Sequence, residues 1–233
     1  MWLNEGFTTY VENRIVEAVY GKVQADEEFI IAADELLREV KATPAPTQRL
    51  VPDLDDADDA ASDFAYVKGA WLLRTLEARF GREAFDVYLR GYFDHFAFQS
   101  ITTQQMLDYL KPNLLDKYPG KMSLDEVKAW IHQGGVPADA PLPTSPQLQA
   151  IAAARSQWLE GKRTAIKLDA KHWNTQEWMY FLDGLPDKLS AKQLADLDAA
   201  WHLNGSPNAE IARRWYLAAA RADFRPARTQ MAK

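Results

Sequence analysis

The sequence of 233 residues contains no cysteine. Disulfide bonds and zinc sites built from thiolates are therefore excluded. The absence of cysteine fits a reducing cytoplasm, and it fits a cysteine-poor periplasmic enzyme as well, so the compartment stays open. For a full-length protein that contains this chain we favour the cytoplasm, with the periplasm as the alternative.

Long apolar runs and an excess of positive charge are missing too. No apolar stretch approaches the ~20 residues that span a bilayer, and the N-terminus lacks the charged start and apolar run of a signal peptide. The net charge is −6, and no basic run of useful length would attract nucleic acid or an anionic membrane. We therefore expect no membrane and no nucleic-acid partner.

Histidine is scarce, with four residues at His95, His132, His172 and His202. None of them belongs to H-E-x-x-H or to any pair at i and i+4, the spacing that places two imidazoles on one helix face. A G-x-S-x-G motif and a glycine-rich phosphate loop are absent as well. The sequence thus contains no complete histidine metal site and no sign of a serine nucleophile.

The residues that are present favour helices. The chain is 47% hydrophobic and has eight Trp, nine Tyr and ten Phe, enough large apolar side chains to bury a core. Apolar residues recur at helical spacing, and no run shows the sustained period-two alternation of a half-buried strand. We predict a mainly α fold, with helices over residues 3–20, 23–40, 64–80, 82–96 and 103–110, the last one stopped by Lys111-Pro112.

A proline-rich stretch divides the chain. Four prolines fall within the eleven residues from Val136 to Pro146, and such a segment is stiff and cannot continue either flanking helix. We place a linker at 137–146, between a first domain of residues 1–136 and a second domain of residues 147–233.

Helix starts are marked by capping patterns. In the first domain, Ser123 and Glu126 form a capping box, in which each side chain bonds the backbone N–H of the other residue. Four further starts are expected after the linker, at Ser145-Pro146, Asn174 with Glu177, Ser190 with Gln193, and Ser206-Pro207. Their spacing predicts antiparallel helix pairs stacked as an α-solenoid of the armadillo or HEAT type. The last residues, 225–233, do not look like a polar capping helix, so we expect the second domain to be truncated.

The first ten residues are the most informative. They read M-W-L-N-E-G-F-T-T-Y and resemble the W-L-N-E-G-[FHT]-x-x-[YF] segment of the gluzincin aminopeptidases, peptidase family M1, which includes aminopeptidase N and leukotriene A4 hydrolase. Taken alone, Glu5 would be a solvated side chain. The resemblance implies that Glu5 is the third protein ligand of a catalytic zinc ion. In that family H-E-x-x-H precedes this glutamate by eighteen residues, so we expect both histidine ligands and the general base upstream of Met1.

A second marker is Tyr66, which lies 61 residues after Glu5 in the segment F-A-Y-V-K-G. The segment resembles the P-Y-E-K-G motif of the same family, and the spacing is close to that of the family. The resemblance implies that the Tyr66 hydroxyl donates a hydrogen bond to the oxyanion formed during peptide hydrolysis. Ala65 and Val67 replace the usual proline and glutamate, and neither change removes the hydroxyl.

Three further residues are candidates for supporting the metal or shaping the substrate pocket. Asn4 precedes the proposed ligand, and Glu12 matches a position that is often acidic in the family. Seven residues of helix separate Glu12 from Glu5 by ~10 Å, so the two carboxylates cannot share one metal ion. Asp58 aligns with an acidic position near the substrate pocket of leukotriene A4 hydrolase, although a loop or cap role is better supported in this run of aspartates.

The resemblance extends over nearly the whole chain. It implies the helical lobe of a thermolysin-like catalytic domain in residues 1–136, followed by a helical domain like the C-terminal domain of leukotriene A4 hydrolase. The parent protein would be a zinc aminopeptidase acting on peptides, a hydrolase. We expect the chain alone to bind no zinc and to be inactive, because both histidines and the general base are missing.

Two hypotheses on partners remain. If the chain is a fragment, Trp2, Leu3 and Phe7 form an apolar surface to be covered by the missing N-terminal half, and the isolated chain should self-associate. The alternative is a stand-alone helical scaffold that binds a protein partner through the concave face of the solenoid.

Overall fold

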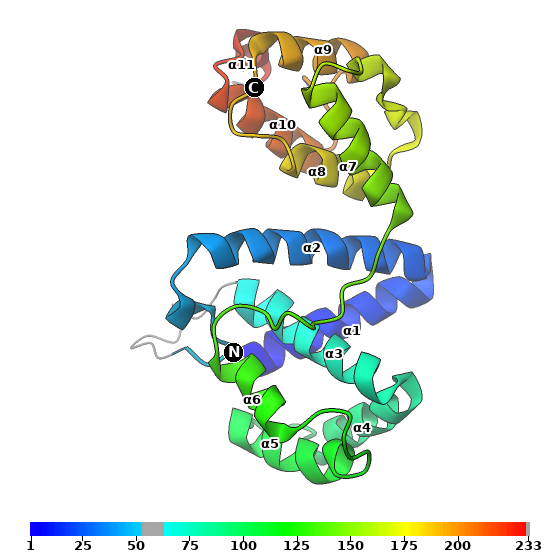
Figure 1. The fold of residues 1–233 in the computed structure, drawn as a ribbon, viewed down its shortest axis with the longest axis vertical. Helices are drawn as coiled ribbons and strands as arrows, with labels where there is room; N and C mark the ends of the chain where they lie inside the picture. The colour runs from blue at the N-terminus through cyan, green and yellow to red at the C-terminus, as the bar shows by residue number, and fades with distance from the viewer. Residues whose placement is uncertain (53–62, 232–233) are drawn as a thin grey trace. The chain divides into compact units, whose positions relative to one another are not determined.

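The computed structural model describes residues 1–52 and 63–231, and all regular elements within these ranges are helical (Figure 1). The predicted mainly α fold is confirmed. The chain divides into two compact units, Met1–Pro143 and Thr144–Lys233, and the division falls inside the proline-rich stretch. Within the described ranges, no helix has both the length and the hydropathy needed to cross a membrane.

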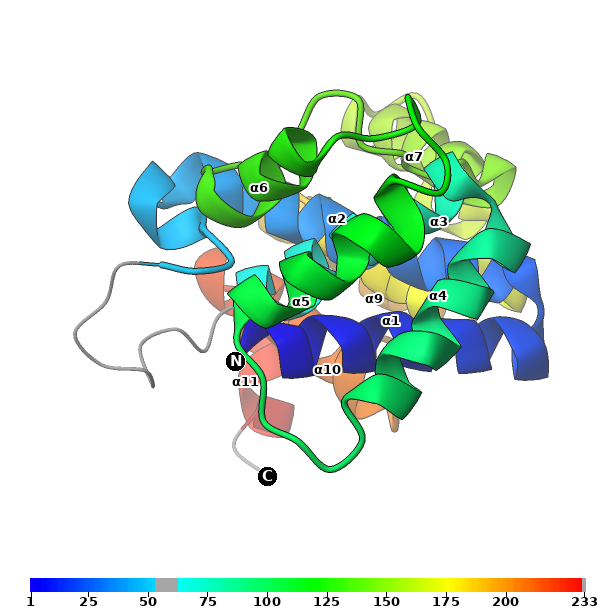
Figure 2. The same ribbon diagram turned by 90° about the horizontal axis from the view of Figure 1, so that it is seen from below.

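Unit 1 contains six α-helices and three shorter helical turns in its described part. The α-helices are α1 (Trp2–Tyr20), α2 (Lys22–Ala42), α3 (Gly69–Phe80), α4 (Arg82–His95), α5 (Thr103–Leu110) and α6 (Leu124–His132). The turns are the 3₁₀ helix η1 (Ala45–Gln48) and two π-helical turns, η3 (Phe64–Lys68) and η4 (Lys111–Leu115). Helix α1 is central and packs against α2, η3 and α3, as Figures 1 and 2 show.

The core of unit 1 is rich in aromatic rings. Tyr10 of α1 meets Phe85 of α4 edge to face with ring centroids 5.5 Å apart, and Phe29 of α2 meets Trp71 of α3 in the same way at 5.5 Å. All four side chains are buried. Burial of rings of this size stabilises the fold by roughly 2 kcal/mol each, and edge-to-face pairing adds about 1 kcal/mol. These pairs tie the four longest helices of the unit together.

Two glycines allow α1 and α3 to cross with their backbones in contact. A Cβ atom added to Gly6 would lie 2.9 Å from the Cα of Gly69, and a Cβ added to Gly69 would lie 2.9 Å from the Cα of Gly6. Both positions are buried. No side chain fits between the two helices at this point, so the crossing requires glycine on both sides.

Several helix starts follow the predicted chemistry. Ser123 with Glu126, Asn174 with Glu177, and Ser190 with Gln193 all form reciprocal capping boxes, and Ser145 caps the helix that begins at Pro146. Each such cap satisfies backbone N–H groups that have no partner within the helix and contributes about 1 kcal/mol.

One predicted boundary was confirmed and one was wrong. Helix α5 ends at Leu110 as predicted, and the chain continues in the π-helical turn η4, which carries Pro112 in its first turn, where a helix does not need the missing N–H. Ser206-Pro207 does not begin the last long helix of unit 2. Asn208 caps it instead, accepting bonds from the backbone nitrogens of Glu210 and Ile211.

Unit 2 consists of helix pairs in its described part. Its α-helices are α7 (Pro146–Leu159), α8 (Thr175–Asp183), α9 (Ala191–Trp201), α10 (Ala209–Arg221) and α11 (Arg225–Met231), with short 3₁₀ turns at Ala165–Leu168 and Ala170–His172. Helix α8 packs against α7 and α10, and α10 against α11. Arg155 of α7 caps the last turn of α8, because its Nη1 donates to the backbone carbonyls of Tyr180 (2.6 Å) and Phe181 (3.3 Å). Positive charge at a helix C-terminus is favourable.

The glycine crossing makes a testable prediction. We expect Gly6→Ala to lower the free energy of unfolding by about 2 kcal/mol, because the methyl group must push two backbones apart. Alanine is otherwise preferred over glycine inside helices by ~1 kcal/mol. The matched control is Gly91→Ala in α4, whose added Cβ would meet only the hydroxyl of Tyr109, the movable end of a side chain. Equal urea midpoints for the two variants would contradict a backbone-to-backbone crossing.

Candidate functional site

The structure brings Glu5 and Tyr66 together. Glu5 lies in the first turn of α1, and Tyr66 lies in the middle of the π-helical turn η3. The charge of Glu5 is the main cause that raises the pKa of Tyr66, and a side-chain hydrogen bond to Glu5 contributes to the same shift. Two residues 61 positions apart in the chain thus face each other at one place on the surface of unit 1.

The glycine crossing explains this proximity. Gly6 follows Glu5 directly, and Gly69 begins the helix that continues η3. Because the two backbones touch there, side chains next to the crossing are brought close as well. Tyr66 remains 40% exposed and Glu5 is half-buried, so both groups can be reached by a ligand.

The π-helical turn that holds Tyr66 is anchored by Lys68. This side chain is fully buried and donates from Nζ to the backbone carbonyls of Gln48 (2.8 Å) and Gln133 (2.7 Å). Burial lowers the pKa of Lys68 to about 8. Lys68 therefore ties η3 to the end of η1 and to the end of α6. Lys68 was not predicted as a site residue, and its position within the F-A-Y-V-K-G segment is the one sequence signal that marks it.

The other predicted site residues are placed differently. Asn4 is exposed and donates from Nδ2 to Oε1 of Glu5 at 3.1 Å, so it adjoins the candidate ligand. Glu12 is exposed two turns further along α1. Asp58 lies outside the described residues.

The apolar surface expected at the start of α1 is not where it was predicted. Trp2 and Phe7 are 3% and 4% exposed, because Trp2 donates from its indole nitrogen to Thr103 (3.0 Å) and Phe7 stacks on Tyr92 at 4.7 Å. Leu3 is half-buried. Helices α4 and α5 thus cover most of the surface that was assigned to a missing partner.

A groove of about 910 Å³ runs along α1 and the segment from Tyr92 to Thr103. Asn4 and Glu12 line it, whereas Glu5 and Tyr66 do not. The large apolar side chains exposed along it are Met1, Ile15, Phe93 and Phe98, at 52%, 57%, 49% and 109% exposure. The groove is therefore next to the Glu5–Tyr66 pair but separate from it.

The donor set on this chain fits one part of a zinc site. Catalytic zinc sites use three protein ligands and keep one position for water. Among the described residues, no group of three or more His, Asp or Glu side chains is placed to hold a metal. Glu5 is half-buried and reachable, as a single carboxylate ligand must be. The remaining donors would have to come from outside the described residues.

The helical fold is shared with metallopeptidases of one family. The profile described as the peptidase family M1 domain matches residues 1–130, and the profile described as leukotriene A4 hydrolase, C-terminal, matches residues 173–233. The chain belongs to peptidase family M1.

Individual relatives agree with this. Leucine aminopeptidase 2-1 of Meyerozyma guilliermondii is 30% identical, in an alignment that covers 93% of this chain and 38% of the relative. Leukotriene A-4 hydrolase of Xenopus laevis is 30% identical, with 92% and 37% covered. The structure of yeast LTA4 hydrolase in complex with bestatin superposes with a TM-score of 0.83 at 26% identity, covering 99% of this chain and 42% of that one. The chain therefore spans about two-fifths of the length of these relatives.

The buried lysine predicts a pH dependence. In the folded chain the pKa of Lys68 is about 8, below its ordinary value of 10.5, so between these values the unfolded state binds more protons. Stability must then rise with pH across that window, because the cost of the buried charge disappears. We expect the urea midpoint of the chain to increase from pH 8 to pH 9.5 relative to that of Lys68→Met. Parallel midpoints in the two proteins would show that Lys68 does not titrate in this way.

Proposed function

We propose that this chain is the C-terminal part of a zinc-dependent aminopeptidase that removes N-terminal residues from peptides. The observation that supports this most directly is the contact between Glu5 and Tyr66. In the family that the chain resembles, these positions hold a zinc ligand and an oxyanion donor. Several relatives are leucine aminopeptidases.

Each residue has a distinct role in this proposal. Glu5 supplies one carboxylate ligand, and its contact with Asn4 at 3.1 Å restricts the orientation of that carboxylate. Tyr66 supplies an O–H donor for the negative charge that develops on the carbonyl oxygen. Lys68 keeps η3, and with it the phenol, in place.

A phenol suits the oxyanion role only while it is protonated. The neighbouring carboxylate and partial burial both raise the pKa of Tyr66, so the hydroxyl keeps its proton at neutral pH. Removal of one oxyanion donor typically costs about 10²–10³-fold in kcat. When bound, zinc polarises the peptide carbonyl and lowers the pKa of its water ligand.

The zinc ligands and the general base that this chain does not supply would come from a partner segment. Two imidazoles and a general base are required, and we propose that they come from an N-terminal half that bears H-E-x-x-H. Without that half the chain holds a single carboxylate for zinc, so we propose that it is inactive alone.

Zinc content and turnover test this proposal. The isolated chain should retain well under one equivalent of zinc after dialysis and should not hydrolyse an aminoacyl-nitroanilide. A longer chain, in which H-E-x-x-H precedes Glu5 by eighteen residues, should bind one equivalent of zinc and turn over. In that protein Glu5→Gln should lose zinc, whereas Tyr66→Phe should keep zinc and lose about 10²–10³-fold in kcat.

Each measurement tests one part of the proposal. One equivalent of zinc or measurable turnover in the isolated chain would overturn the proposed inactivity. Unchanged kcat in Tyr66→Phe, or unchanged zinc content in Glu5→Gln, would overturn the role of that residue.

We further propose that the apolar side chains exposed along the groove are covered by the N-terminal half, and that the isolated chain self-associates through them. Light scattering should then give a mass above that of the 26.4 kDa monomer, and the double variant Phe93→Ser and Phe98→Ser should restore the monomer. Val87→Ser is the matched control, since Val87 is 66% exposed on α4 but does not line the groove. A monomeric wild-type chain that binds no hydrophobic dye would contradict the proposal.

A further inference from the structure

Unit 1 contains a short internal repeat. Residues 14–26 and residues 74–86 both read R-x-x-E-A-x-[YF]-G-[KR]-x-x-x-D, with a spacing of 60 residues. Each copy includes the last two turns of one helix, a single glycine, and the first turn of the next helix. Helical periodicity alone does not distinguish this repeat from other amphipathic segments, so it was not predicted.

The backbone repeats as well. Gly21 between α1 and α2 has φ 91° and ψ 162°, and Gly81 between α3 and α4 has φ 89° and ψ 148°. This region of backbone conformation is accessible essentially only to glycine. In both copies the glycine N–H donates to the glutamate carbonyl four residues earlier, and the glycine carbonyl accepts from the residue four positions later. The α1–α2 and α3–α4 hairpins therefore have the same corner.

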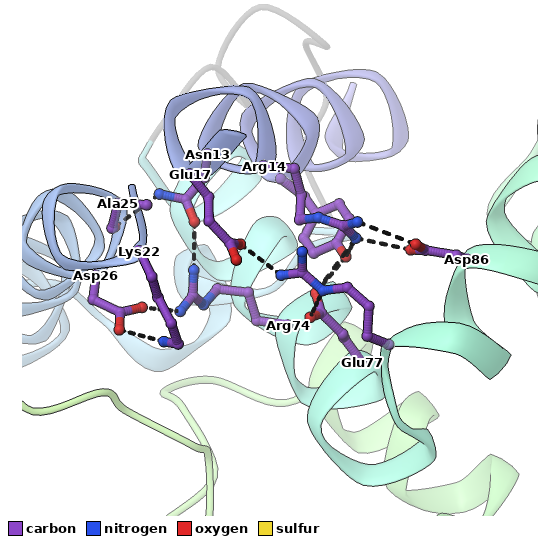
Figure 3. Close-up of polar contacts among 11 residues, drawn as sticks. Asn13, Arg14, Glu17, Lys22, Ala25, Asp26, Arg74, Glu77 and Asp86 are labelled. Carbon is purple, nitrogen blue, oxygen red and sulfur yellow. Dashed lines mark hydrogen bonds and ion pairs between the residues drawn. The ribbon is translucent and has the colours of Figure 1, made fainter. Parts of the chain in front are cut away.

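The two hairpins exchange ion pairs. Arg14 of the first hairpin donates to both carboxylate oxygens of Asp86 in the second hairpin, at 2.9 and 3.2 Å. Arg74 of the second hairpin donates to Asp26 of the first at 3.1 Å. The arginine and the aspartate occupy the same repeat positions in both copies, so each hairpin gives an arginine and receives one. Figure 3 shows both pairs, Arg14 with Asp86 and Arg74 with Asp26.

Both guanidinium groups lie over an aromatic ring, but the rings are not equivalent in the repeat. Arg14 lies over Tyr10 of its own hairpin at 5.8 Å, and Arg74 lies over Phe29 of the other hairpin at 4.1 Å. The four paired side chains are 15–23% exposed. Their partial burial makes these charge-assisted bonds stronger than surface ion pairs.

The charges of the repeat are balanced. Four basic and four acidic side chains take part, namely Arg14, Lys22, Arg74 and Arg82 with Glu17, Asp26, Glu77 and Asp86. The symmetry is incomplete at one position. Arg82 reaches across to Glu17 at 2.6 Å, whereas Lys22 pairs with Asp26 of its own hairpin.

We propose that the two hairpins are equivalent halves that recognise each other by this exchange of arginine and aspartate, and that the exchange positions Glu5 against Tyr66. Helix α1 is held at two points along its length. The glycine crossing holds it against α3 beside Glu5, and the Arg14–Asp86 pair holds it against α4, about 12 Å further along the helix. Contacts at these two points fix the direction of α1 relative to the α3–α4 hairpin.

The part of this proposal that concerns Glu5 and Tyr66 rests on the proposed function, but the exchange between hairpins does not. Failure of the zinc test would leave the exchange standing. Failure of the test below would leave the proposed aminopeptidase function standing.

Charge inversion tests the exchange. Inversion of the first hairpin alone, Arg14→Asp with Asp26→Arg, places like charges at both contacts. We expect this variant to lose at least a hundredfold in the folding equilibrium constant or to fail to fold. Inversion of both hairpins, by adding Arg74→Asp and Asp86→Arg, restores opposite charges at both contacts and should recover most of that loss. A fourfold variant no better than the twofold variant would overturn the proposal.

Single substitutions compare how much each ion pair contributes to the folding equilibrium constant. Asp26→Asn and Asp86→Asn should each lower the folding equilibrium constant by about tenfold, since each leaves a partly buried arginine without its charged partner. Asp94→Asn on the exposed face of α4 is the matched control and should change it less than about twofold. A large effect at one repeat position with none at the other would overturn the equivalence.

Crosslinking tests the positioning role under conditions where the chain is folded. The chain has no cysteine, so Glu5→Cys with Tyr66→Cys gives a short bis-maleimide two attachment sites only. Adding Asp26→Asn and Asp86→Asn should slow crosslinking severalfold, while the rate with a monofunctional maleimide stays the same. An unchanged crosslinking rate would show that the ion pairs contribute stability without positioning the site.

Discussion

The constraint on which the rest of unit 1 depends is the contact of two helix backbones at Gly6 and Gly69. Helices that cross with bulkier side chains between them stay 8–10 Å apart, and at that separation the groups beside the crossing would not meet. Because the backbones touch, the first turn of α1 and the π-helical turn before α3 share one small region. The Glu5–Tyr66 contact is a consequence of this packing rather than of any attraction between the two side chains.

Local features of the fold followed from the sequence, and contacts between distant segments did not. The capping boxes at Ser123, Asn174 and Ser190 depend on side chains within three residues of each other, so their sequence patterns were sufficient. The end of α5 before Pro112 was predicted, whereas the π-helical turn that follows was not, because proline is compatible with a first helical turn. The burial of Trp2 depends on Thr103, which is 101 residues away, and no local pattern reports such a partner.

The candidate site shows the same limit. Glu5 and Tyr66 were found through motifs, and their proximity was implied by a resemblance rather than by any physical property of either segment. Lys68 was missed because a buried lysine without a carboxylate partner contradicts the usual distribution of charged residues. Its two acceptors are backbone carbonyls from separate parts of the chain, Gln48 and Gln133, and backbone groups leave no trace in a sequence pattern.

The single-residue corners at Gly21 and Gly81 restrict where the chain length can vary within the family. Neither corner has a spare residue, and an insertion in either one would rotate the following helix by about 100° and move its charges out of reach. Across related sequences, changes in length should therefore be absent from residues 14–26 and 74–86.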